Sequence, residues 1–144
     1  MLEFGYSKKA IGLYLNNVNL GTIEKPSLIT TFLGPCGDSM KLYLRITENG
    51  IIEKAKFTYL GCVGSAVSAS AITTLLKGIT IDQAKSITEE DIIRELGGLP
   101  ESKLDCAKLS IRTLQKAIEE YEKLTNRAEQ VPNFFKKYNE GKSE

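Results

Sequence analysis

Three cysteines, Cys36, Cys62 and Cys106, are the residues of this chain best suited to chemistry. The thiolate form of cysteine binds metal ions and attacks sulfur. The chain contains no histidine, which excludes a Ser-His-Asp or Cys-His catalytic pair supplied by this chain alone. The same absence excludes an intrachain zinc site that uses imidazole. The three thiols are therefore the leading candidates for a functional site.

Each cysteine lies where the pattern predicts the end of a structural element. Cys36 lies in Gly34-Pro-Cys-Gly-Asp38, a predicted turn between two strands. Cys62 lies in Gly61-Cys-Val-Gly-Ser65, between a strand and a helix of small residues, and Cys106 lies in the first turn of the last helix. Free amide N–H groups at a helix N-terminus favour an anion, so the latter two thiols should ionise readily.

The spacing of the cysteines leaves two interpretations open. Free cysteine often behaves as a small buried apolar residue, and no Cys-x-x-Cys pair marks a metal or thiol-redox motif. Against this structural interpretation, all three cysteines fall at element ends, where functional sites are usually built. Their odd number and the absence of a disulfide framework fit a reducing compartment.

The first half of the chain predicts an antiparallel sheet. Three segments have the composition of strands: 27–33, 41–47 and 52–59. Glu48-Asn-Gly50 predicts a hairpin turn, because Asn-Gly tolerates the positive φ of tight turns. The middle segment alternates, which places Leu42 and Leu44 on one face and Tyr43 on the other. We therefore expect a three-stranded antiparallel meander.

The rest of the chain predicts helices. Their signals are caps at Ser7 and Thr88, stops at Gly78 and Gly97-Gly98, and three-and-four spacing from Leu104 to Tyr121. The expected helices cover 7–15, 65–77, 80–86, 88–96 and 104–121, the last extending toward Ala128. The fold class is α+β, a three-stranded antiparallel sheet with helices packed on one face. We expect one domain over 1–128 and a C-terminal tail or short docked helix over 129–144.

Composition narrows the class of protein further. With 144 residues, 42% of them apolar and 26% charged, the chain has the size and composition of one globular domain. Its net charge of +1 gives no indication of a nucleic-acid partner. The sequence contains neither the roughly 20-residue apolar stretch of a membrane span nor a signal-peptide pattern. We expect a soluble cytoplasmic protein without a membrane partner.

The motifs around the cysteines resemble the IscU/NifU family of iron–sulfur cluster assembly scaffolds. The resemblance rests on Gly34-Pro-Cys-Gly-Asp-Ser-Met-Lys41, Gly61-Cys-Val-Gly-Ser-Ala-Val-Ser-Ala-Ser70 and Gly98-Leu-Pro-Glu-Ser-Lys-Leu-Asp-Cys106. These motifs occur in the family's order, and Tyr6-Ser-Lys-Lys9 is similar to its N-terminal signature. The resemblance covers about Tyr6 to Tyr121, and the family's fold agrees with the one predicted above.

The resemblance implies a non-catalytic scaffold that binds iron. Cys36, Cys62 and Cys106 would hold a [2Fe–2S] cluster, or a [4Fe–4S] cluster shared by two chains. Sulfur would come as persulfide from a cysteine desulfurase, and the cluster would pass to apo-proteins. Asp38 would serve iron entry and act as a labile oxygen ligand, and Lys103 would stabilise anionic sulfur. Without the resemblance, Asp38 would be a turn residue and Lys103 a solvated surface lysine.

The chain departs from the family pattern at two places. Asp105 replaces the histidine that usually precedes the third cysteine, and we consider it as an additional ligand or as a solvent-facing helix residue. The family's chaperone-docking stretch, Leu-Pro-Pro-Val-Lys, is here Leu99-Pro-Glu-Ser-Lys103. Loss of the second proline weakens a preset extended shape, which makes chaperone docking doubtful.

Two further expectations concern the competing function and the oligomeric state. The alternative function is a zinc-dependent sulfurtransferase of the SufU type, with Zn²⁺ held by Cys36, Asp38, Cys62 and Cys106. SufU-like chains usually carry an insertion before the third cysteine, and this sequence has no such insertion. Because one chain offers only three thiols, an all-thiolate [4Fe–4S] cluster needs a second chain. We expect a monomer without the cluster and a homodimer with it.

Overall fold

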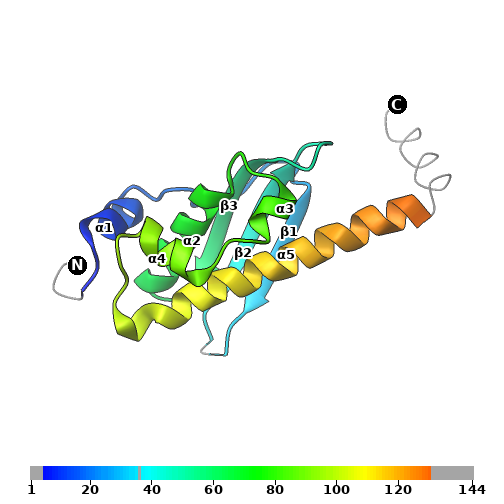
Figure 1. Ribbon diagram of the computed structural model, residues 1–144. Coiled ribbons are helices and arrows are strands. Elements are labelled where there is room, and N and C mark those ends of the chain that lie inside the picture. Colours follow the sequence, from blue (N-terminus) through cyan, green and yellow to red (C-terminus); the bar gives the residue numbers. More distant parts are fainter. Residues whose placement is uncertain (1–4, 36, 131–144) are drawn as a thin grey trace.

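A three-stranded antiparallel sheet forms the centre of the fold (Figure 1). The computed structural model describes residues 5–35 and 37–130. The strands follow each other in the order β1-β2-β3 and have these bounds: β1 Leu28–Leu33, β2 Ser39–Ile46 and β3 Ile52–Leu60. Gly50 takes a φ of 80° in the β2–β3 connection, as the predicted hairpin turn requires. The predicted meander is confirmed.

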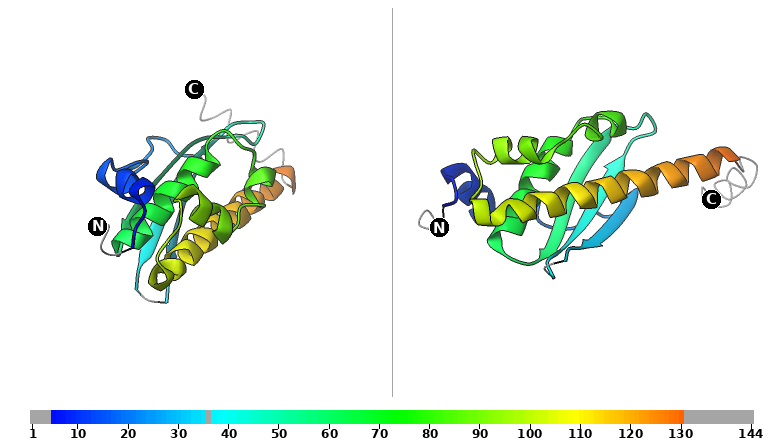
Figure 2. Two further views of the ribbon diagram at one scale, coloured as in Figure 1. Left: turned by 60° about the vertical axis from the view of Figure 1, so that its left-hand side comes forward. Right: turned by 60° about the horizontal axis from the view of Figure 1, so that its bottom comes forward.

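Helices cover one face of this sheet (Figure 2). Their bounds are α1 Lys8–Leu15, α2 Val63–Leu76, α3 Ile81–Ala84, α4 Glu89–Glu95, the 3-10 turn η2 Glu101–Lys103, and α5 Leu104–Gln130. Helix α2 lies against β3, and α5 lies beside it against β1 and β2. Helix α1 packs on α2, and α4 contacts both α2 and α5. The predicted α+β class, with its helices on one face, is confirmed.

The helix boundaries follow from their caps. The Ser7 side chain accepts a hydrogen bond from the Ala10 N–H at the start of α1. Thr80 and Thr88 each form a capping box, with Gln83 and Asp91 respectively, at the starts of α3 and α4. The predicted stops at Gly78, Gly97 and Gly98 all adopt positive φ, a conformation that glycine reaches without steric strain.

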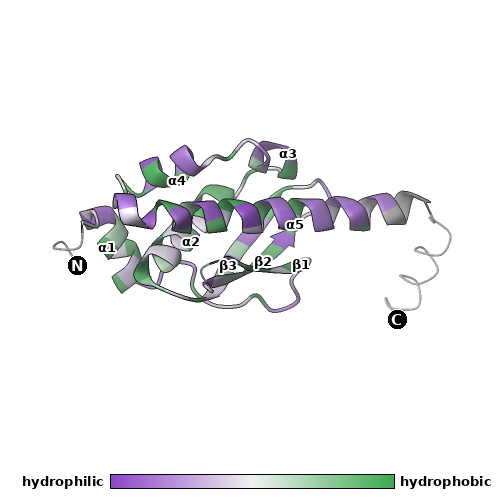
Figure 3. Ribbon diagram, turned by 90° about the horizontal axis from the view of Figure 1, so that it is seen from below, coloured by the Kyte–Doolittle hydropathy of each residue, from purple (hydrophilic) through white to green (hydrophobic). Residues whose placement is uncertain are grey.

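The core lies between the sheet and helices α2 and α5. Almost every residue of α2 is buried, and most of these residues are small, so the helix backbone lies close to its neighbours. Helix α5 is amphipathic: it buries Ala107, Ile111, Leu114 and Ile118, and Figure 3 shows hydrophilic and hydrophobic residues alternating along it. Packing of α2 and α5 against one sheet fixes the relative positions of their N-terminal ends.

The sequence did not indicate how the outer face of the sheet is covered. Tyr43 faces away from Leu42 and Leu44 as predicted, yet it is only 9% exposed. The Arg45 guanidinium donates a hydrogen bond to the Glu24 carbonyl oxygen, so the connection between α1 and β1 runs across this outer face.

The C-terminal end of α5 lies at the predicted boundary between the domain and the tail. The helix continues through residue 128 to Gln130. Residues 131–144, most of the segment expected to be a tail or docked helix, lie outside the described residues, as does Pro132.

Candidate metal centre

Three segments that are distant in sequence meet at one end of the sheet. Asp38 directly precedes β2, Cys62 is the N-cap of α2, and Cys106 lies in the first turn of α5. One carboxylate oxygen and two sulfur atoms from these residues all lie within 4.8 Å of one another. The fold thus brings together three of the four predicted ligands.

The distances within this group suit a single metal ion. The Sγ atoms of Cys62 and Cys106 are 3.7 Å apart, and Cys62 Sγ is 3.7 Å from Asp38 Oδ2. A tetrahedral ion with metal–sulfur bonds of about 2.3 Å separates two sulfur ligands by about 3.8 Å. Both thiolates can therefore bind the same ion without a large movement of either side chain.

Cys36 is the predicted ligand that lies outside the described residues. Two described residues on either side of it are joined, because the Gly34 N–H donates a hydrogen bond to the Asp38 carbonyl oxygen at 2.8 Å. The Gly37 N–H donates in turn to the Gly34 carbonyl oxygen at 3.1 Å. The role of Cys36 stays a prediction.

Two glycines create the space in which the ligands converge. A Cβ atom at Gly64 would lie 2.8 Å from Cys106 Sγ, and one at Gly61 would lie 2.6 Å from Asp38 Cγ. Both separations are shorter than real Cβ contacts. Glycine is therefore required on steric grounds in the stretch after β3, because Asp38 and Cys106 approach the start of α2 closely there.

The two described thiols differ in acidity. Burial raises the pKa of Cys62, but the N–H and hydroxyl of Ser65, the Cys106 thiol and the Lys103 charge together bring this pKa below its ordinary value. Burial raises the pKa of Cys106 to about 11, and the nearby Cys62 adds to that increase. Of these two thiols, Cys62 is therefore the one that is readily available as a thiolate.

Lys103 and Asp105 occupy very different positions. The Lys103 side chain lies over Gly64, with Cδ 3.1 Å from the position of a Cβ there. Interaction with Cys62, and then with Tyr6, raises the pKa of Lys103, so its positive charge acts on the thiol group. The Asp105 side chain is 87% exposed and lies 3.9 Å from the Lys108 ammonium group. Asp105 does not belong to the group of converging donor atoms.

Two residues near the thiols were not identified from the sequence as parts of the site. The Ser65 hydroxyl donates a 2.7 Å hydrogen bond to Asp38 Oδ2. The Tyr6 hydroxyl lies 3.2 Å from the position of a Cβ at Gly64, and burial raises its pKa. Ser65 follows Cys62 by three residues, which puts both on the same helical turn; that spacing was the available signal. No short-range spacing in the sequence indicates that Tyr6 lies near the cysteines.

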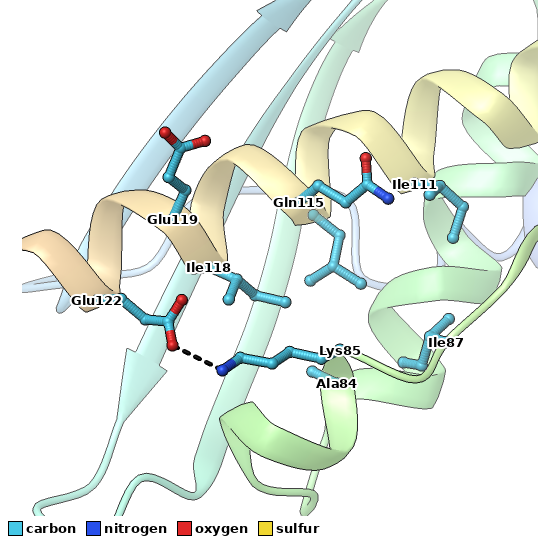
Figure 4. Close-up of a pocket in the computed structure, with 9 residues that line it drawn as sticks. Ala84, Lys85, Ile87, Ile111, Gln115, Ile118, Glu119 and Glu122 are labelled. Carbon is cyan, nitrogen blue, oxygen red and sulfur yellow. Dashed lines mark hydrogen bonds and ion pairs between the residues drawn. The ribbon is translucent and has the colours of Figure 1, made fainter.

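A groove elsewhere on the surface is separate from the thiols. It lies between α3 and α5, has a volume of about 360 Å³ and is lined mainly by Ala84, Ile87, Ile111, Leu114 and Ile118 (Figure 4). The Lys85 ammonium and the Glu122 carboxylate form a 2.6 Å ion pair at its side. None of its lining residues belongs to the group around Cys62.

Comparisons with known proteins match most of the chain. The family model described as "NifU-like N terminal domain" matches residues 5–128. The chain is 36% identical over 133 residues to the iron–sulfur cluster assembly scaffold protein IscU of Aquifex aeolicus, covering 90% of this chain and 84% of that protein. It is 37% identical over 120 residues to the protein of the same name from Azotobacter vinelandii, covering 81% and 93% of the two chains.

Solved structures show the same fold at lower sequence identity. A putative iron–sulfur cluster assembly scaffold protein for the SUF system from Fervidobacterium islandicum is similar with a TM-score of 0.65 and 21% identity, covering 78% of this chain and 96% of that one. A NifU-like N-terminal structure from Brucella abortus has a TM-score of 0.63 and 18% identity, covering 85% and 97%. Within the part of the chain that the structure describes, no helix is long and apolar enough to span a membrane.

Proposed function

Because the chain belongs to the NifU-like N-terminal domain family, we propose that it is a scaffold on which an iron–sulfur cluster is assembled and from which it passes to apo-proteins. The observation that carries this proposal is the convergence of Asp38, Cys62 and Cys106 within 4.8 Å. Two relatives that the chain matches over most of its length are named as such scaffolds. The role is one of assembly and transfer rather than catalysis.

The proposed ligands of the cluster are Cys36, Asp38, Cys62 and Cys106. Thiolates suit iron–sulfur clusters, whereas a carboxylate is a harder ligand that exchanges more readily. Asp38 therefore gives the site one weak position, which suits a protein that must release its cargo. Lys103 stabilises anionic sulfur through its charge, whereas Asp105, which is exposed and paired with Lys108, is not proposed as a ligand.

The zinc-dependent sulfurtransferase remains the second candidate. The observation that favours it is the 3.7 Å separation of the two sulfur atoms, which equally suits a single Zn²⁺ with one oxygen ligand. The connection between Cys62 and Cys106 speaks against it. That connection is filled by α2, α3, α4 and η2 with short links between them, so it carries no additional loop. We therefore keep the scaffold as the first candidate.

The partners follow from the same proposal. A cysteine desulfurase supplies sulfur, and apo iron–sulfur proteins accept the cluster. Thiols 3.7 Å apart stay reduced only in a reducing compartment, so we propose a cytoplasmic location. Chaperone docking at Leu99–Lys103 is not part of the proposal, because Glu101–Lys103 forms a 3-10 turn after Pro100 instead of an extended segment.

The test is anaerobic purification followed by measurement of iron, zinc and acid-labile sulfide per chain. We expect iron and sulfide in near-equal amounts with a visible charge-transfer band. Cys106→Ser should lose the bound cluster yet keep the circular dichroism spectrum of the folded domain. Stoichiometric zinc that iron and sulfide cannot displace would favour the sulfurtransferase, and a full cluster in Cys106→Ser would show that this cysteine is structural.

A further inference from the structure

The Ser65 hydroxyl contacts all three donor atoms of the candidate metal centre. It donates a 2.7 Å hydrogen bond to Asp38 Oδ2 and lies 3.8 Å from the sulfur atoms of both Cys62 and Cys106. The residue is only 3% exposed. Its hydroxyl is therefore held in place, enclosed by the carboxylate and the two thiols.

The location of Ser65 follows from the helix start. With Cys62 as N-cap, Ser65 is the third residue of α2, and its side chain lies on the same turn as the cysteine. Packing of α2 against α5 brings Cys106 to this turn. Asp38 comes from the opposite side, where the missing Cβ of Gly61 leaves room for its carboxyl group.

The Asp38 carboxylate depends on this one hydroxyl for its orientation. Within residues 5–35 and 37–130, its hydrogen bonds are the one from Ser65 and a longer 3.7 Å contact with the Cys62 thiol. An ionised carboxylate only accepts hydrogen bonds, and each oxygen has two lone-pair positions. Oδ2 can therefore keep the hydrogen bond from Ser65 and still bind a metal ion.

We propose that Ser65 is the positioning residue that aims the Asp38 carboxylate at the two thiols and so completes the donor set for a metal ion. This inference rests on the proposed function, because it assigns Ser65 a role in the same site. Ser65 itself is not a ligand. Without its hydroxyl, the Asp38 side chain in the loop before β2 is free to rotate into solvent, and the site loses its preorganised oxygen donor.

The test is a double-mutant cycle on the metal-free protein, with Zn²⁺ as the probe in a competition titration under reducing conditions. Removal of an outer partner of a metal ligand typically lowers affinity by about 10–100-fold. We expect Ser65→Ala to weaken Zn²⁺ binding by about that factor and Asp38→Ala to weaken it at least as much. The double variant should bind no more weakly than Asp38→Ala alone, because Ser65 acts only through Asp38.

Ser68→Ala is the matched control. Ser68 lies one turn further along α2 and is fully buried, and its hydroxyl has no hydrogen-bond partner among the described residues. Its removal should leave the Zn²⁺ affinity unchanged, whereas a general effect of losing a buried hydroxyl from α2 would appear in both variants. Circular dichroism checks that each variant is folded.

The outcomes separate the inference from the proposed function. The role of Ser65 would be overturned if Ser65→Ala and Ser68→Ala bound Zn²⁺ with equal affinity. It would also be overturned if the effects of Ser65→Ala and Asp38→Ala multiplied in the double variant. Either result would leave the scaffold proposal standing. A wild-type chain that binds neither Zn²⁺ nor an iron–sulfur cluster would contradict the proposed function itself, and this inference with it.

Discussion

At the scale of single residues, the two described thiols are chemically unequal although they lie 3.7 Å apart. The pKa of Cys62 is lowered and that of Cys106 is raised to about 11. At pH 8 the Cys106 thiol is then almost entirely protonated, and the thiolate is the form that reacts with iodoacetamide. We predict that Cys62 of the metal-free protein is alkylated much faster than Cys106, as measured by mass spectrometry of peptides over time.

This prediction has an internal control in the denatured chain. In urea both thiols lose their surroundings and should react at similar rates. Equal rates in the folded protein, or faster alkylation of Cys106, would contradict the difference in acidity.

An alanine substitution at Gly64 tests how tightly the site is packed. Gly64→Ala places a methyl group 2.8 Å from Cys106 Sγ, so the thiol or the helix must shift from its present position. We predict Zn²⁺ affinity weaker by roughly tenfold and a loss of stability of roughly 1–3 kcal/mol from overpacking, measured by competition titration and urea unfolding.

The control for that variant is Gly12→Ala. Gly12 lies within α1, and a Cβ there would have no neighbour within 4 Å in the part of the chain that the structure describes. Alanine is a better helix former than glycine by about 0.5–1 kcal/mol, so this variant should be slightly more stable with unchanged Zn²⁺ affinity. If Gly64→Ala also keeps its Zn²⁺ affinity and its stability, glycine is not required on steric grounds at position 64.

Sequence motifs indicated the candidate ligands but not the other residues that lie beside them. Thiols and carboxylates are groups that bind metal ions, and functional sites are usually built at the ends of elements. Both facts single out Cys62, Cys106 and Asp38 in the sequence. The three-residue spacing places Ser65 on the helical turn of Cys62, but its contacts with Asp38 and Cys106, like the position of Tyr6, come from packing between segments distant in the chain, which no local pattern records. The position of Asp105 was equally inaccessible, because the rotation of α5 decides which of its side chains face the sulfur atoms.

At the scale of elements, the capping boxes predict a stability that depends on pH. The backbone N–H of Thr88 is the main group that lowers the pKa of Asp91, assisted by the Thr88 hydroxyl and Arg94. A depressed carboxyl pKa stabilises the fold above the ordinary pKa near 4, and the contribution is lost as the pH falls through the folded-state value. Asp91→Asn should therefore lower the urea midpoint at pH 7 and have little effect at acidic pH.

Gln83 provides the matched comparison for Asp91. It occupies the same position in the α3 capping box but carries no charge. Gln83→Ala should lower the urea midpoint by a similar amount at pH 7 and at acidic pH. An Asp91→Asn effect that is equally constant with pH would show that its charge does not matter.

These elements were also the most predictable part of the fold, for local reasons. The Asn-Gly turn, the Thr caps and the glycine stops each act within four residues, so the sequence alone indicates them. The burial of Tyr43 was not predictable, because the alternation of β2 indicates only which face a side chain lies on.

At the scale of the whole molecule, the number of thiols leads to a prediction about the oligomeric state. One chain has three cysteines, so an all-thiolate [4Fe–4S] cluster requires a second chain. Leu33 and Leu60 are 68% and 72% exposed and lie in register across Ser39 at the end of the sheet that carries the site. We predict a monomer without the cluster and twice that mass with it, by light scattering under anaerobic conditions.

Serine substitutions test the contribution of these leucines. Leu33→Ser with Leu60→Ser should weaken the cluster-bound dimer but leave the Zn²⁺ affinity of the single chain unchanged. Leu124→Ser is the control, because Leu124 is 52% exposed on α5 near its other end. A cluster-loaded protein that remains monomeric would contradict the shared cluster.

The assembly of the site from distant segments also has a thermodynamic consequence. Asp38, Cys62 and Cys106 are neighbours only in the folded chain, so the unfolded chain cannot offer a comparable site. Occupancy therefore stabilises the folded state by mass action, by about 2.7 kcal/mol when the free ligand is at 100 times its dissociation constant. The melting temperature thus reports the fraction of the protein whose site is occupied. In a cell, the empty form unfolds more often and is the form that proteases remove first.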